Sequence, residues 1–129
     1  MGPAVKAIFD TNLLIANDVR AVPEEIGIST ISLAELHYGV LVAAETQRAL
    51  RLRRLAAIES RFTALPVDSE VARNYGLIYQ LVAGTGRKPQ ARSFDLLIAA
   101  TAMTHDAILY TRNIKDFSGL ESALEVRAL

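Results

Sequence analysis

Short apolar runs alternate along this chain with longer stretches in which apolar residues recur every three or four positions. The short runs predict buried strands over residues 5–9, 26–31, 64–67, 107–111 and 124–127. The longer stretches predict a helical turn at 13–16 and helices over residues 32–45, 46–60, 69–83 and 93–104. Strands separated by helices predict a mostly parallel twisted sheet between two helical layers, an α/β/α architecture.

Capping residues and glycines mark some of the predicted boundaries. Asp68 or Ser69 is expected to cap the helix that follows, and Gly84 to end it in a left-handed conformation. The segment GTGRKPQARS, residues 84–93, is the one break in composition, and it predicts a flexible loop.

Length and composition narrow the class of protein. A chain of 129 residues suits a single domain with one core, residues 1–129. The longest apolar stretch, residues 94–103, is interrupted by Asp95 and is shorter than the roughly 20 residues of a membrane span. The first residues lack the pattern of a secretory signal and there is no cysteine, so we expect a cytoplasmic protein without disulfides.

The net charge neither favours nor excludes nucleic acid as a partner. Lys plus Arg and Asp plus Glu number 14 each. A polyanion would therefore have to be recognised through local basic patches rather than through a global positive field.

Four acidic residues are predicted to meet at one edge of the sheet. Asp10 follows the first predicted strand directly, and Asp116 follows the strand at 107–111 after a short loop. Glu35 and Asp95 stand near the starts of helices that lead away from the same edge. Because ligands of open α/β sheets bind beyond the carboxyl ends of the strands, we expect the four carboxylates to share a crevice.

Each acid also has a purely structural interpretation. Glu35 lies three residues after Ser32, the spacing of a capping box, and on its own this reading is the stronger one. Asp95 in a first helical turn gains from the helix dipole, and Asp116 is a residue type that favours turns. Asp10 has the weakest structural explanation, because it lies between an apolar strand and an apolar helical turn. Taken together, the four acids favour a functional site.

The chemistry of such a cluster points to a divalent metal. Carboxylates that share a site repel one another unless a cation neutralises them. Oxygen ligands without thiolates select Mg2+ or Mn2+ rather than Zn2+. Metal-assisted hydrolysis of phosphodiesters is the reaction class that this donor set suits.

Four motifs identify a family resemblance that covers essentially the whole chain. They are FDTNLLI around Asp10, STISLAELHYGV around Glu35, FDLLIAATAM with Asp95, and YTRNIKDF with Asp116. In this order and spacing the chain resembles the PIN-domain nucleases, in particular the VapC-type toxins of bacterial toxin–antitoxin pairs.

The resemblance implies a Mg2+- or Mn2+-dependent endoribonuclease whose metal-binding and catalytic acids are Asp10, Glu35, Asp95 and Asp116. It places Thr11, Thr111 and Asn113 at positions that line or support this site. It also implies a homodimer and a small antitoxin protein that wraps the toxin and blocks the site. The chain departs from many members at Phe94, where those members carry asparagine.

Basic residues supply candidate RNA contacts in two regions. Arg87, Lys88 and Arg92 flank the entrance to the Asp95 helix, and Arg112 lies beside the last acid. A mobile basic loop explains the first three equally well. Arg48, Arg51 and Arg54, with Arg53 and Arg61 nearby, form either a phosphate-contacting stripe or the solvated face of a helix, and we favour the solvated face.

Two other functions remain open at this point. A haloacid-dehalogenase-like phosphatase would use Asp10 as a covalent nucleophile, although the position of its usual general acid holds Asn12. A catalytically silent binding module with the same fold is the other.

Overall fold

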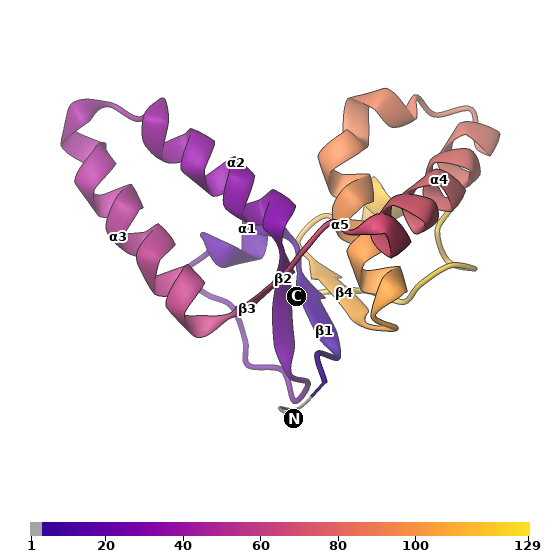
Figure 1. The fold of residues 1–129 in the computed structure, drawn as a ribbon, viewed down its shortest axis with the longest axis horizontal. Helices are drawn as coiled ribbons and strands as arrows, with labels where there is room; N and C mark the ends of the chain where they lie inside the picture. The colour runs from indigo at the N-terminus through magenta and orange to yellow at the C-terminus, as the bar shows by residue number, and fades with distance from the viewer. Residues whose placement is uncertain (1–3) are drawn as a thin grey trace.

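The computed structural model describes residues 4–129 and contains one five-stranded sheet in the order β3-β2-β1-β4-β5 (Figure 1). All four strand pairings are parallel. The strands are β1 (Ala7–Phe9), β2 (Ile26–Ser29), β3 (Thr63–Leu65), β4 (Ile108–Thr111) and β5 (Val126–Ala128). An entirely parallel sheet flanked by helices confirms the predicted fold class.

In the described part of the chain, five α-helices and two 3-10 turns connect the strands. The α-helices are α1 (Thr11–Leu14), α2 (Thr30–Leu41), α3 (Glu45–Arg61), α4 (Ser69–Gly84) and α5 (Ser93–Thr104). The 3-10 turns are η1 (Pro89–Arg92) and η2 (Ile114–Phe117). Within residues 4–129, none of the helices combines the length and apolar character needed to cross a bilayer.

Successive side chains of the central strands point to opposite faces of the sheet, so the core consists of two clusters, one on each face. Ile8 of β1 and Leu109 of β4 are fully buried in the cluster that contains α4 and α5. Their neighbours Phe9 and Tyr110 point the other way and pack with Leu13 of α1. Phe9 also contacts the ring of Phe62, just after α3, at a centroid distance of 6.2 Å.

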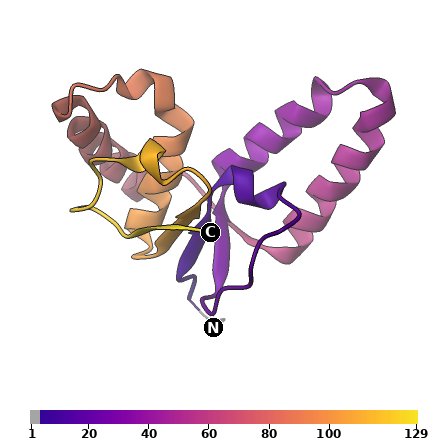
Figure 2. The same ribbon diagram turned by 180° about the vertical axis from the view of Figure 1, so that it is seen from behind.

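The α2–α3 hairpin projects from the sheet on the side away from α4 and α5, as Figures 1 and 2 both show. Its outer part carries large exposed apolar side chains, among them Tyr38 at 66% and Leu41 at 73% exposure. The carboxyl ends of β1 and β2 therefore lie between two walls, the α2–α3 hairpin on one side and α4 and α5 on the other.

Helix capping differs from the sequence prediction at the start of α2. Strand β2 ends at Ser29 rather than at residue 31, and the Ser29 side chain caps α2 by accepting a hydrogen bond from the Ile31 amide at 3.1 Å. The capping-box interpretation of Ser32 and Glu35 is therefore wrong. Asp68 caps α4 as predicted, through a 2.9 Å hydrogen bond from the Val71 amide.

The end of α4 also differs from the prediction. Gly84 is the last helical residue, and the left-handed conformation falls on Gly86, with φ +83°. The segment 84–93 is not irregular throughout, because η1 forms within it and leads directly into α5. Pro89 is buried at the start of this turn. The turn fixes the path of the chain just before Asp95.

Candidate functional site

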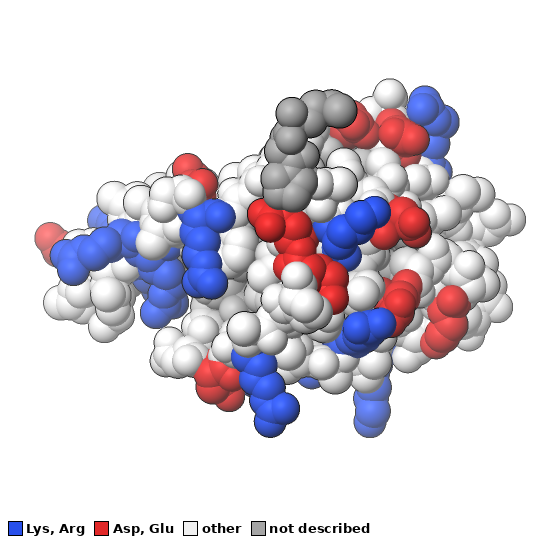
Figure 3. All heavy atoms as spheres, turned by 90° about the horizontal axis from the view of Figure 1, so that it is seen from below, with Lys and Arg blue, Asp and Glu red and all other residues white. Residues whose placement is uncertain are grey.

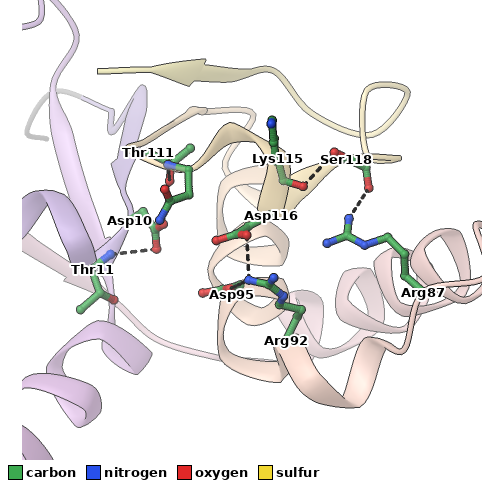
Figure 4. A network of polar contacts seen from close by, with 10 residues as sticks. Asp10, Thr11, Arg87, Arg92, Asp95, Thr111, Lys115, Asp116 and Ser118 are labelled. Atoms are coloured by element: carbon green, nitrogen blue, oxygen red, sulfur yellow. Dashed lines mark hydrogen bonds and ion pairs between the residues drawn. The ribbon is translucent and has the colours of Figure 1, made fainter.

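Asp10 occupies the position between β1 and α1, where it caps the short helix. Its Oδ1 accepts a hydrogen bond from the Thr11 amide at 2.9 Å, and its Oδ2 accepts one from the Thr111 hydroxyl at 2.8 Å (Figure 4). Only 5% of the residue is exposed. Burial raises the pKa of Asp10, and the Asp116 carboxylate adds to this rise, while the two hydrogen bonds oppose it.

Glu35 is tied to Asp10 through Thr11. The Thr11 hydroxyl donates to Glu35 Oε1 at 2.7 Å and lies 2.8 Å from the Ser32 hydroxyl. Burial raises the pKa of Glu35, and the Asp10 charge raises it further, against the hydrogen bond from Thr11. The Glu35 side chain therefore does not cap a helix. It belongs to a group of four acids that we call the acidic centre: Asp10, Glu35, Asp95 and Asp116.

Asp95 and Asp116 share one arginine. Arg92 Nη1 lies 2.8 Å from Asp116 Oδ1 and 3.6 Å from Asp95 Oδ2, and Figure 4 shows the guanidinium between the two carboxylates. Asp95 stands in the first turn of α5 and Asp116 in η2, so Arg92 links two segments that are distant in sequence.

The four carboxylates influence one another electrostatically. Burial raises the pKa of Asp95 to about 6, and the charges of Asp10, Asp116 and Glu35 contribute to the rise, while Arg92 opposes it. Glu35, Arg92 and Asp95 also line one hollow of about 370 Å³. The structure thus brings the four predicted acids to one edge of the sheet.

The donor set suits Mg2+ or Mn2+, but the side chains are not arranged as a finished metal centre. Among residues 4–129, no three Asp, Glu, His or Cys side chains are placed to hold one ion together. The Arg92 guanidinium supplies the positive charge between Asp95 and Asp116 instead. Carboxylate oxygens are suitable ligands for a hard cation, which would have to displace the Arg92 guanidinium from Asp95 and Asp116.

The other predicted site residues have different environments. Besides binding Asp10, the Thr111 hydroxyl accepts a hydrogen bond from the Asn113 amide at 3.0 Å, so Asn113 supports the site through its backbone. Arg112 pairs with Asp18 at 2.6 Å, and Arg87 donates to the Ser118 carbonyl at 3.2 Å. Lys88 is exposed. Arg92 is the one candidate RNA contact of these four that touches the acids.

Two features of the centre escaped the sequence prediction. The sequence suggests Ser32 as a helix cap, yet its side chain is fully buried and contacts Thr11. The three-residue spacing of Ser32 and Glu35, which puts both on one helix face, was the available signal. The bridge from Arg92 to Asp116 had no sequence signal, because it depends on the packing of η2 against α5. Phe94, at the position of the family asparagine, is 51% exposed and lines the hollow beside Asp95.

The raised pKa of Asp95 predicts a pH dependence of stability in the metal-free protein. Between about pH 4 and pH 6 the native state retains a proton that the unfolded chain releases, so stability falls as the pH rises through this window. We expect the free energy of unfolding in urea to fall less steeply for Asp95→Asn than for the wild type over this range. If the free energy of unfolding changes with pH in the same way in both proteins, the raised pKa of Asp95 is contradicted.

Comparison with known proteins shows which protein family has this fold and sequence. Residues 7–120 match the PIN domain, and the chain belongs to the PIN-domain family. Ribonuclease VapC5 of Mycobacterium tuberculosis is 34% identical over 95% of this chain and 93% of that protein. Ribonuclease VapC1 of Rickettsia felis is 35% identical over 92% of each chain.

Solved structures agree with this assignment. A chain in the crystal structure of VapBC-5 from Mycobacterium tuberculosis, a member of the VapBC family of toxin–antitoxin systems, superposes with a TM-score of 0.80 at 34% identity. The match covers 97% of this chain and 98% of that one. A chain of VapBC2 from Rickettsia felis, bound to a promoter DNA fragment, gives a TM-score of 0.75 at 26% identity, covering 95% of this chain and 98% of that one.

Proposed function

We propose that this chain is a divalent-metal-dependent endoribonuclease that acts as the toxin of a toxin–antitoxin pair, through a single nuclease domain. Mg2+ or Mn2+ would be held by Asp10, Glu35, Asp95 and Asp116. The observation that carries the proposal is the meeting of four carboxylates from four separate segments at one edge of a PIN-domain sheet, with raised pKa values at three of them.

The bound ion would supply a Lewis acid and an activated water for hydrolysis of an RNA phosphodiester. The chain itself supplies orientation. Thr11 holds Asp10 through its amide and Glu35 through its hydroxyl, which fixes two carboxylates relative to each other. Thr111 holds the remaining oxygen of Asp10. Such neighbouring hydrogen bonds keep ligands in position.

Arg92 has two tasks in this proposal. Without metal it neutralises Asp95 and Asp116. A bound ion would take over this neutralisation, and the guanidinium of Arg92 would then be available to a phosphate oxygen of the RNA, a partner that its planar donors suit.

The partners follow from the relatives. Solved relatives of the chain are VapBC toxin–antitoxin proteins, which supports our proposal of a cognate antitoxin that binds this chain. We also propose a homodimer, which rests on the family resemblance alone. We propose that it acts in the cytoplasm, where it would meet its RNA substrate.

Cleavage of RNA by the purified chain tests the proposal. We expect a labelled single-stranded RNA to be cut in Mn2+, to remain intact when EDTA is in excess, and to be cut again when Mn2+ is restored. Cleavage that persists in EDTA would contradict the metal requirement. Intact RNA under every condition, with no effect of Mn2+ on protein stability, would favour the silent module instead.

A further inference from the structure

Two hollows lie beside α1, on the α3 side of the acidic centre. The first, of about 380 Å³, has an apolar floor that includes Phe9, Leu13 and Phe62. The second, of about 280 Å³, lies between α1, α2 and α3 and is lined in part by Thr11 and Glu35.

The two hollows share part of their lining, and the second one borders the acids. Arg54 and Ile58 of α3 line both of them. Thr11 and Glu35 belong to the acidic centre and also line the second hollow. Thr11 and Arg54 therefore mark a path that leads from the acids along the second hollow to the first. We name this path the α3 groove.

The α3 groove is basic although the protein has no net charge. Three arginines line the first hollow, Arg20, Arg54 and Arg61, and its lining contains no acidic residue. Among the described residues none of the three forms an ion pair, and Arg61 lies over the Phe62 ring at 5.1 Å. In Figure 3 basic side chains predominate over the α2–α3 hairpin, at the left. The five arginines of α3 named in the sequence analysis are exposed, as a solvated helix face predicts, and two of them, Arg54 and Arg61, also line the first hollow.

We infer that the α3 groove binds the RNA strand next to the scissile phosphate, with phosphates on Arg54 and Arg61 and a base against the apolar floor. This inference rests on the proposed nuclease function. Single-stranded nucleic acid is typically held by a basic track with aromatic or apolar surfaces for the bases. A polyanionic occupant matches the charge, and the opening of the groove onto the acids favours the substrate over an acidic protein segment.

Equilibrium binding measured by fluorescence anisotropy tests the inference. The parent protein carries Asp10→Asn so that the RNA stays intact, and the probe is a labelled single-stranded RNA of about 16 nucleotides. We expect Arg54→Gln to weaken binding about fivefold or more and to reduce the slope of log K against log salt by about 0.7, the effect of one lost phosphate contact. Arg53→Gln is the matched control, since Arg53 is exposed on the same helix and lines neither hollow.

Equal effects of the two substitutions, or no effect of Arg54→Gln, would overturn the inference. If the wild type nevertheless cuts RNA, the proposed function survives that result. Failure of the parent to bind RNA also overturns the inference, and the wild-type cleavage assay then decides whether the proposed function falls with it. Polyglutamate that displaces the RNA as effectively as polyuridine would instead assign the groove to an acidic protein.

Discussion

Replacing Asp10 by asparagine is expected to abolish RNA cleavage while the fold is retained. The substitution removes one negative charge from the proposed metal site and keeps the size of the side chain. Loss of an outer-shell partner typically costs about 10- to 100-fold in metal affinity or activity, and loss of a direct ligand should exceed that range. Cleavage rates in Mn2+, with circular dichroism to confirm the fold, measure the effect.

Asp68→Asn is the matched control for this substitution. Asp68 caps α4 and forms no contact with the four acids, and asparagine caps a helix about as well as aspartate. We expect this variant to cleave RNA at the wild-type rate. Cleavage by Asp10→Asn at a rate close to that of Asp68→Asn would contradict the role of Asp10.

Replacing Arg92 by glutamine is expected to tighten Mn2+ binding. In the metal-free protein Arg92 holds Asp95 and Asp116, so an incoming ion must displace its guanidinium. Removing a competitor of this kind should raise the affinity about tenfold, within the usual range of coupling between binding events. Isothermal titration with Mn2+ in the absence of RNA measures this directly and does not depend on activity.

Arg87→Gln provides the comparison. Arg87 lies in the same connection between α4 and α5, but its guanidinium contacts the Ser118 carbonyl rather than an acid. We expect its Mn2+ affinity to equal that of the wild type. If Arg92→Gln binds Mn2+ no more tightly than Arg87→Gln, Arg92 is not a competitor of the metal.

Most of the fold could be predicted because its strands and helices have clear periodicities. The run over residues 5–9 and the repeat over 93–104 correspond to β1 and α5. The boundary between β2 and α2 could not be placed, because Ser29, Thr30 and Ser32 are all suitable caps and tertiary packing selects Ser29. Gly84 and Gly86 are similarly ambiguous from sequence.

The positions of the acids could be predicted more fully than their interactions. Asp10 at the end of a buried strand and Asp95 in a first helical turn are local features. The pairing of Arg92 with Asp116 is not local, since it requires η1 and η2 to meet at the start of α5. The α3 groove likewise depends on how α3 lies against α1. The spacing of apolar residues predicts each helix but not the position of one helix relative to the other.

Thermal unfolding with and without millimolar Mn2+ tests the central claim most directly, because it asks whether a divalent ion binds at Asp10. An ion that binds only the native state raises its stability by about 2.7 kcal/mol at a hundredfold excess over Kd. We expect the unfolding temperature of the wild type to rise in Mn2+ and that of Asp10→Asn to stay unchanged. An equal rise in both proteins, or none in either, would contradict a metal site built on Asp10.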